Sequence, residues 1–294
     1  MRTVFLGTSD FAATVLRRLA DSPHRPSLVI TRPDRPRGRG RRLAAPPVAG
    51  TARELGLTVD QPASVNDAQT RRQIAESEPD AVCVCAFGAL IKEPLLSEHL
   101  MLNVHPSLLP RWRGAAPVER AIMAGDSATG VSIMRVTAGL DSGPVCAQER
   151  EPITDGDTYG SLAPRLAVLG AELLIGVLSE RPNCDEQDDA RASYADKITA
   201  EDRVLDPLRP AAELERTVRA LAPHIGAHVR LSDGALLGVR AARVVSQGPA
   251  RGAIEGLGGR PVLGCAEGGL ELIAVQPPGK REMSGEDYLR GHRP

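Results

Sequence analysis

The sequence predicts an α/β protein, with an N-terminal doubly wound, mostly parallel sheet followed by a small β-rich domain. In the first half of the 294 residues, short apolar runs alternate with segments of helical periodicity. This alternation is typical of a parallel sheet with helices on both faces. Beyond Asp206, short β segments follow one another between Gly-rich turns, and that spacing suits a small barrel or sandwich.

The N-terminal part opens with a strand over Thr3–Leu6 that ends at Gly7, after which apolar residues recur at helical spacing. Further strands are expected at Leu28–Ile30, Leu57–Val59, Asp80–Phe87, Leu102–His105 and Gly130–Arg135. Helices are expected at Ala49–Leu55, Pro117–Met123 and Thr158–Leu178. Pro117 suits the first turn of its helix, because the N–H that proline lacks has no helical partner there.

Composition changes after the last of these helices. Arg181–Asp189 (RPNCDEQDD) is polar and acidic and contains a proline, which is typical of a linker. A helix follows over Ala211–Leu221, where Glu215 and Arg219 have the spacing of an i,i+4 ion pair. Strands are then expected at Val229–Leu231, Leu236–Val245, Pro261–Leu263 and Leu270–Val275. We therefore expect a first domain over residues 1–188, a linker over 189–205 and a second domain over 206–294.

The overall composition indicates a globular protein of the cytoplasm. Hydrophobic residues make up 42% and charged residues 25% of the chain, which excludes wholesale disorder. The longest apolar run, Ala81–Ile91, has eleven residues and is too short to span a bilayer, which takes about 20. The N-terminus lacks the apolar core of a secretory signal. We expect no membrane association.

The five cysteines, at positions 83, 85, 146, 184 and 265, form an odd set without Cys-x-x-Cys spacing. This pattern predicts free thiols in a reducing compartment and argues against a disulfide framework or a zinc knuckle. Cys83 and Cys85 alternate along an apolar run, so we expect them in the core. The histidines have no partners at metal-ligand spacing, and we expect no metal.

A net charge of −1 hides an Arg-rich segment near the N-terminus. Arg32–Arg42 (RPDRPRGRGRR) contains six arginines and one acid. It has no apolar periodicity, so we expect a mobile surface loop without regular structure. Two interpretations stay open: a merely solvated loop, or a loop that orders on a polyanion such as RNA. The aromatic content of 2% disfavours binding of single-stranded nucleic acid by base stacking.

The residues that suggest chemistry lie in LNVHPSLLPRWRGAAP, residues 102–117. Asn103 and His105 are two apart on a predicted strand, so they share a side, and ligands of open α/β sheets bind at the carboxyl ends of strands. Asp141 lies in a Gly-rich loop and would fix the tautomer of His105 if that loop folds back. The trio contains no nucleophile, which favours direct group transfer with Asn103 as donor to an oxyanion. Two roles for Asp141 remain open: it accepts a proton, or it orients His105. The alternative that all three residues are ordinary turn and loop residues also remains open.

Several motifs, in order, together resemble the methionyl-tRNA formyltransferase family. They are GTSDF at 7–11, RPDRPRGRGRRLAAPPV at 32–48, LNVHPSLLPRWRGAAPVERAI at 102–122, GLDSG at 139–143, YADKI at 194–198 and QPPGKREMS at 276–284. The wider superfamily of folate-dependent formyltransferases shares Asn103-x-His105 and Asp141. The Arg-rich segment and the β-rich domain narrow the resemblance to the enzymes that act on tRNA.

The resemblance implies a Rossmann-like formyltransferase fold with an OB-like C-terminal barrel that binds tRNA. It implies formyl transfer from 10-formyltetrahydrofolate to the methionine amino group of initiator tRNA, by a cytoplasmic enzyme that needs no metal and that we expect to be a monomer. The implied catalytic residues are Asn103, His105 and Asp141. The implied folate contacts are Ser107, Leu108, Leu109 and Pro110. Arg39 matches a family position that approaches the acceptor stem, and we extend the expected tRNA contact to Arg41 and Arg42.

Two alternative functions stay open. One is a different formyl-folate enzyme, which acts on a sugar nucleotide or a purine precursor or hydrolyses formyl-folate. The other is a non-catalytic RNA-binding protein with a degenerate enzyme fold. A small-molecule enzyme has no need for six arginines in residues 32–42, and a degenerate binder should have lost the Asn, His and Asp trio.

Overall fold

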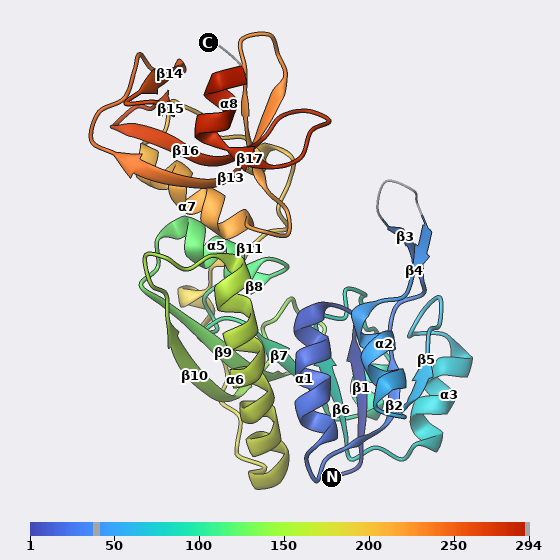
Figure 1. Ribbon diagram of the computed structural model, residues 1–294. Helices are drawn as coiled ribbons and strands as arrows, with labels where there is room; N and C mark the ends of the chain where they lie inside the picture. Colours follow the sequence, from blue (N-terminus) through green and yellow to red (C-terminus); the bar gives the residue numbers. More distant parts are fainter. Residues whose placement is uncertain (38–41, 292–294) are drawn as a thin grey trace. The chain divides into compact units, whose positions relative to one another are not determined.

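The computed structural model describes residues 1–37 and 42–291 of the chain (Figure 1). The chain divides into two compact units. Unit 1 comprises Met1–Gly114, Thr129–Pro152 and Ala163–Tyr194. Unit 2 comprises Ala115–Ala128, Ile153–Leu162 and Ala195–Pro294. The second unit thus includes two segments that precede the expected linker in the sequence.

Unit 1 is built on a seven-stranded sheet. Its strands are β1 (Thr3–Gly7), β2 (Pro26–Ile30), β5 (Thr58–Asp60), β6 (Ala81–Cys85), β7 (Met101–His105), β9 (Ala128–Arg135) and β10 (Val145–Pro152). They lie in the order β10-β9-β7-β6-β1-β2-β5. The strands from β5 to β7 run parallel, and β9 pairs with β7 antiparallel. The predicted mostly parallel sheet is confirmed.

Helices cover both faces of this sheet (Figure 1). They are α1 (Asp10–Ala20), α2 (Pro47–Glu54), α3 (Ala68–Glu76), α4 (Leu95–Glu98) and α6 (Tyr159–Glu180). On one face, apolar side chains of β1, β2 and β6 cluster with Ile74 of α3 and Leu95 of α4. On the other face, α1 approaches β1 so closely that a Cβ at Gly7 would come within 2.9 Å of the Cβ of Ala12. Glycine is therefore required at the turn that ends β1.

The long helix α6 packs on β7 and β9. A Cβ at its Gly170 would lie 2.7 Å from Val104 and 3.1 Å from Val131, so the missing side chain allows the close approach. By length and composition α6 is the one helix in the described part of the chain that suffices to cross a membrane, and half of that stretch is buried inside the protein.

Unit 2 combines an antiparallel sheet with helices. Its elements are α5 (Pro117–Ala124), α7 (Ala211–Leu221), β12 (Ala227–Arg230), β13 (Leu236–Val245), β14 (Ile254–Leu257), β15 (Arg260–Gly264), β16 (Gly269–Gln276), β17 (Met283–Ser284) and α8 (Gly285–Gly291). The sheet runs β12-β13-β16-β15-β14, and β17 pairs with β16. Leu214 and Val218 of α7 are buried in one cluster with Leu237 and Leu272 of the sheet. The small β-rich second domain is confirmed.

Two predictions for α7 can be compared directly with the structure. Its bounds, Ala211–Leu221, are those expected from the apolar periodicity. The side chains of Glu215 and Arg219 form the expected i,i+4 pair, with Nε 2.7 Å from Oε1. The helix could therefore be predicted from local sequence, from one apolar face and one ion pair.

Candidate active site

His105 is the last residue of β7, and its side chain is 4% exposed. Its Nε2 lies 2.9 Å from the main-chain carbonyl oxygen of Trp112. A carbonyl oxygen only accepts hydrogen bonds, so Nε2 carries a proton and donates it to Trp112. The other ring nitrogen, Nδ1, faces Oδ2 of Asp141 at 3.7 Å. Nδ1 is therefore the nitrogen that is left for chemistry.

Asp141 reaches His105 from the loop between β9 and β10. Its Oδ2 accepts a hydrogen bond of 2.9 Å from the N–H of Gly114. Its φ is 44°, in the left-handed region that residues other than glycine rarely adopt. Such a backbone conformation persists only where the surroundings hold it. The carboxylate of Asp141 is thus held in two ways: by its hydrogen bond with Gly114 and by the contacts that keep the loop in this conformation.

Asn103 lies two residues before His105 on the same strand. The main chain of β7 is paired on both sides, with Val84 of β6 and Met134 of β9 opposite Asn103. Its side chain is half-buried, and within residues 1–37 and 42–291 it makes no hydrogen bond. Its amide N–H groups are therefore free to meet a ligand at the carboxyl end of β7.

The segment Ser107–Pro110, implied as a folate contact, is tied down by internal hydrogen bonds. Ser107 is fully buried, and its hydroxyl donates to the carbonyl oxygen of Arg111 at 2.6 Å. Ser132 donates to the carbonyl oxygen of Ser107 at 2.6 Å and accepts from the N–H of Leu109 at 3.1 Å. The hydroxyl of Ser107 is therefore already hydrogen-bonded within the protein. Leu108 and Pro110 have the more exposed side chains of this segment.

A cavity of about 340 Å³ lies at the carboxyl ends of β1 and β6. Its lining comes from the turns after these strands and from both flanks of the Arg-rich segment: Thr8, Ser9, Ala86, Phe87, Gly88, Arg32, Pro33, Arg35, Pro36 and Ala44–Pro47. The hydroxyl of Thr8 donates to the carbonyl oxygen of Phe87 at 2.8 Å and joins the two turns. Because β6 is the neighbour of β7 in the sheet, the cavity opens at the edge where Asn103 lies.

The Arg-rich segment differs in part from the expectation of an irregular loop. Its flanks form two short antiparallel strands, β3 (Arg35–Arg37) and β4 (Arg42–Ala44), with Pro36 opposite Leu43. The antiparallel pairing of these flanks satisfies main-chain groups that composition alone does not assign to a ladder. Arg39 and Arg41 lie outside the described residues, and of Arg42 only the main chain is described. Their expected contact with tRNA stays a prediction.

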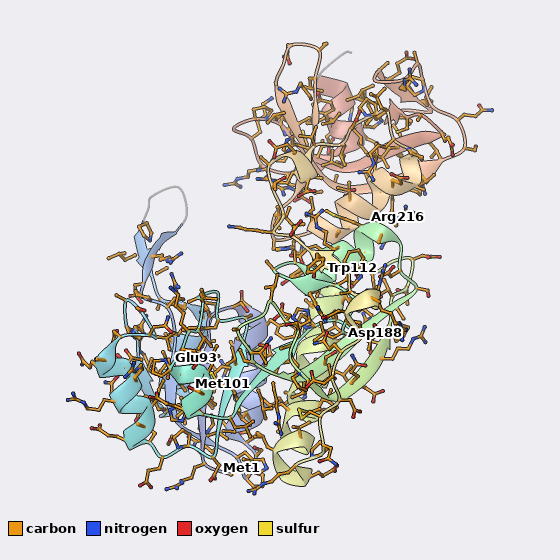
Figure 2. The ribbon with its side chains drawn as sticks, turned by 180° about the vertical axis from the view of Figure 1, so that it is seen from behind. Met1, Glu93, Met101, Trp112, Asp188 and Arg216 are labelled. Atoms are coloured by element: carbon orange, nitrogen blue, oxygen red, sulfur yellow. A yellow bond between two sulfur atoms is a disulfide. The ribbon has the colours of Figure 1, made fainter. Side chains whose placement is uncertain are left out.

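The stretch expected as a linker, Arg181–Asp189, is packed against this site, so that prediction was wrong. Asp185 pairs with Val145 of β10 through two main-chain hydrogen bonds of 2.8 and 2.9 Å. The guanidinium of Arg113, 3% exposed, contacts Asp189 at 2.7 Å and Gln187 at 3.0 Å. Figure 2 labels Trp112 and Asp188, the residues that precede Arg113 and Asp189 in the chain. Polar composition indicated exposure but not these partners.

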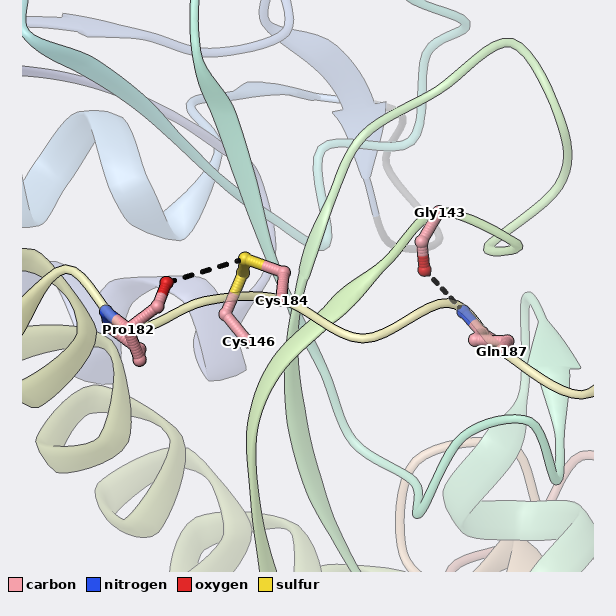
Figure 3. Close-up of a disulfide and its surroundings, with 5 residues drawn as sticks. All are labelled: Gly143, Cys146, Pro182, Cys184 and Gln187. Carbon is pink, nitrogen blue, oxygen red and sulfur yellow. Dashed lines mark hydrogen bonds between the residues drawn. A yellow bond between two sulfur atoms is a disulfide. The ribbon is translucent and has the colours of Figure 1, made fainter.

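The expectation that all five cysteines are free was also wrong. Cys146 and Cys184 form a disulfide (Figure 3). The pairing of Val145 with Asp185 sets the two cysteines opposite each other in an antiparallel ladder, a proximity that a sequence separation of 38 residues does not reveal. Cys83, Cys85 and Cys265 are free and buried, as expected for the first two. Burial raises the pKa of the Cys83 thiol to about 12, which leaves it inert.

An amide, a histidine and a carboxylate lie at the carboxyl edge of an open α/β sheet, an arrangement that suits a group-transfer enzyme. Comparison with known families agrees with this. The family described as "Formyl transferase" matches residues 1–178, and "Formyl transferase, C-terminal domain" matches residues 197–293. A methionyl-tRNA formyltransferase of Methylococcus capsulatus is 43% identical over 99% of this chain and 97% of the relative. The chain belongs to the formyl transferase family, and within it to the methionyl-tRNA formyltransferases.

Solved structures share the fold. A methionyl-tRNA formyltransferase from Clostridium thermocellum superposes with a TM-score of 0.62 at 14% identity, over 83% of this chain and 94% of that chain. HypX from Aquifex aeolicus, in complex with tetrahydrofolic acid, superposes with a TM-score of 0.66 at 17% identity, over 98% of this chain and 47% of that chain. At these identities the likeness extends to the fold alone.

Proposed function

We propose that this enzyme transfers the formyl group of 10-formyltetrahydrofolate to the α-amino group of methionine on initiator tRNA. The observation that carries the proposal is the 43% identity, over nearly the whole of both chains, to an enzyme named for formylation of methionyl-tRNA. The proposal places the enzyme in the cytoplasm, where translation starts, and it treats the chain as a monomer.

The cavity at the carboxyl ends of β1 and β6 suits a folate in size. Its volume of about 340 Å³ lies within the range of small-molecule sites, about 300 to 1,000 Å³. The turns at Thr8 and Phe87 would hold the folate, and Leu108 and Pro110 would contact it from the loop after β7. The folate supplies an activated formyl group; this chain supplies binding, orientation and charge stabilisation.

Asn103, His105 and Asp141 take the catalytic roles in this proposal. The free amide of Asn103 donates to the formyl oxygen as negative charge develops on it, which is the role of an oxyanion hole. Nδ1 of His105 either donates to that oxygen in the charged form or accepts a proton from the attacking amine in the neutral form. Asp141, at 3.7 Å from Nδ1, balances the charged form or takes the proton in turn.

Arg39, Arg41 and Arg42 are proposed to contact the acceptor end of the tRNA. The support is that Arg32 and Arg35, on the N-terminal flank of the same segment, line the cavity beside the catalytic edge. A tRNA held by the rest of this segment would bring its 3′ end to that edge. Arginine suits the role because its planar guanidinium pairs with phosphate and stacks on unpaired bases.

The test is formyl transfer from 10-formyltetrahydrofolate to initiator Met-tRNA, compared with elongator Met-tRNA and with free methionine. The expected result is a strong preference for initiator Met-tRNA in kcat/KM. The catalytic variant Asn103→Ala, assayed beside the wild type, excludes a contaminating activity. Equal activity on the three acceptors, or transfer to an amino sugar in their place, would contradict the proposal.

A further inference from the structure

We propose that Gln187 is a positioning residue that holds Asp141 in its active orientation toward His105. The catalytic meaning of this inference rests on the function proposed above, whereas the geometry does not. Gln187 lies in the polar stretch after α6, far from Asp141 in sequence, and its side-chain hydrogen bonds within the described residues go to Arg113, Asp141 and Gly143. None of these bonds goes to the imidazole of His105, so the effect of Gln187 on the reaction would pass through the loop that carries Asp141.

The side-chain amide of Gln187 donates to two main-chain carbonyl oxygens of the loop that carries Asp141. Its Nε2 donates to the carbonyl oxygen of Asp141 at 2.9 Å and to that of Gly143 at 2.7 Å; Figure 3 shows the second bond. Both amide hydrogens are thus used on the main chain that flanks the catalytic carboxylate. Since Asp141 has a φ of 44°, the loop needs such an external constraint to stay in this conformation.

The other end of the same amide fixes its orientation. Oε1 of Gln187 accepts from Nε of Arg113 at 3.0 Å, and a guanidinium only donates. The NH₂ group of Gln187 must therefore face the carbonyl oxygens and not the arginine. Arg113 is itself immobilised, because it is buried and its NH2 nitrogen lies 2.7 Å from Asp189.

These contacts close a ring around Asp141. The residue after Arg113, Gly114, donates its N–H to Oδ2 of Asp141 at 2.9 Å, while Arg113 holds Gln187 and Gln187 holds the Asp141 carbonyl. The carboxylate and the carbonyl of Asp141 are thus both tied to one short element, β8 (Arg113–Gly114). Loss of the Gln187 donors opens this ring on the main-chain side.

Gln187 is in turn anchored to β10. The disulfide of Cys184 lies three residues before it and the main-chain pair of Asp185 with Val145 two residues before it, as Figure 3 shows for the disulfide. With so short a tether, Gln187 has little freedom to follow the loop if the loop moves. A positioning role needs such a fixed support, because a mobile glutamine would not constrain the main chain that it bonds.

The variant that isolates this role is Gln187→Glu. A glutamate of the same shape still accepts from Arg113 but has no hydrogens for the carbonyl oxygens, which it repels. We expect kcat for formyl transfer to fall by about 10- to 100-fold, since a misplacement of about 1 Å at a reacting group can cost 10²-fold. KM for both substrates should stay within about threefold, because Gln187 touches neither. Gln69→Glu, the same change on exposed α3, should match the wild type.

A second readout does not depend on any substrate. The amide of Gly114 donates to the carboxylate of Asp141, so its proton chemical shift and its rate of hydrogen exchange report where that carboxylate lies. In Gln187→Glu we expect an upfield shift and faster exchange of the Gly114 amide, and no change in Gln69→Glu. Asp141→Ala gives the reference value for a Gly114 amide without its acceptor.

The two readouts separate the proposals. If the wild type formylates no tRNA but the Gly114 amide still responds to Gln187→Glu, the proposed function fails and the positioning role stands. If Gln187→Glu keeps the wild-type kcat and the wild-type Gly114 amide, the positioning role is overturned, whatever the substrate. Should Gln187→Glu fail to fold, Gln187→Met, which also lacks the donors, replaces it. A Gln187→Met defect alongside a normal Gln187→Glu would assign the role to the Arg113 contact and overturn the proposal.

Discussion

Nδ1 of His105 lies 3.7 Å from Oδ2 of Asp141, slightly beyond hydrogen-bond distance. The opposite nitrogen, Nε2, is committed to the carbonyl oxygen of Trp112. Any proton that the imidazole gains or releases during a reaction must therefore pass through Nδ1, on the side of Asp141. The sequence predicts that Asp141 fixes the tautomer of His105. In the structure, the main-chain carbonyl of Trp112 fixes it. Asp141 is therefore available either to accept the proton from Nδ1 or to balance the positive charge of the imidazole.

Asn103→Ala should lower kcat by about 10²- to 10³-fold, which is the usual cost of one lost oxyanion donor. His105→Ala should cost at least about 10²-fold for the same reason. KM for the formyl donor should change only a few-fold, because both groups act on the transition state. Steady-state kinetics with initiator Met-tRNA measure both constants. A raised KM at unchanged kcat would show that these residues bind substrate and do no more.

Asp141→Asn should abolish most activity and leave the thermal unfolding midpoint nearly unchanged. The amide oxygen of asparagine can still accept the hydrogen bond of Gly114, so the loop keeps its partner while the negative charge is lost. Activity assays and a melting curve on the same preparation test this. A variant that unfolds at much lower temperature than the wild type would show that Asp141 has a structural role and that the loss of activity follows from misfolding.

The disulfide between Cys146 and Cys184 should stabilise the oxidised protein. In the chain-entropy view, closing a loop of 38 residues contributes up to about 4 kcal/mol to the free energy of unfolding. Reductant should therefore lower the melting temperature of the wild type but not that of Cys146→Ser. Equal melting temperatures for the oxidised and reduced wild type would show that the disulfide contributes nothing to stability.

Asp202 should make unit 2 sensitive to acid. Its carboxylate accepts two hydrogen bonds of 2.9 Å from Arg120, which lowers its pKa from 3.8 to about 2. A carboxyl with a pKa lower in the folded than in the unfolded state stabilises the fold above about pH 4, and that stability is lost as the pH falls toward 2. The full shift corresponds to at most about 2 kcal/mol.

The test of this ion pair is Asp202→Asn, studied by denaturant unfolding at several pH values. The variant should be less stable than the wild type at pH 6, and the difference should shrink as the pH falls toward 2, where the wild-type carboxyl becomes protonated as well. A difference that stays constant over this range would assign the loss to packing and not to the charge.

Most of the fold could be predicted because its central strands carry continuous apolar runs. β6 and β7 lie within two residues of the expected bounds, and β13 and α7 match them. β10 was missed because its sequence, VCAQEREP, is largely polar and lies at the edge of the sheet, with half of its residues exposed. α3 was missed because only Thr70 and Ile74 of its nine residues are buried.

The candidate site was predictable only where the signal is local. Asn103 and His105 share a strand, so spacing places them together. Gln187 could not be predicted from the sequence. Its three partners are Arg113 and two residues of the loop that carries Asp141, and only tertiary folding brings these segments together. A glutamine among acids carries no periodicity that would separate it from a solvated linker. The signal that pointed at this stretch was Cys184, whose partner could not be chosen among five cysteines.

Replacing Arg39, Arg41 and Arg42 with alanine should weaken the use of initiator tRNA and flatten its salt dependence. Each lost phosphate contact reduces the number of counterions that are released when the tRNA binds. The slope of log kcat/KM against log salt concentration therefore becomes less steep, by about 0.9 for each contact with a duplex. Transfer to a small methionine ester, which has no phosphates, should survive at the wild-type rate. That difference between the two acceptors would assign the arginines to tRNA and not to the chemistry.

The matched control removes three arginines elsewhere in unit 1. Arg2, Arg17 and Arg18 are exposed and form surface ion pairs with Glu78, Glu54 and Glu172, and such pairs contribute little to stability. α1 begins at Asp10, directly after the turn that ends β1, so Arg17 and Arg18 at its other end lie toward the amino ends of the strands, away from the catalytic edge. The control variant should keep the wild-type salt slope. If both triple variants flatten the slope equally, net charge alone draws in the tRNA, and a contact by Arg39, Arg41 and Arg42 is excluded.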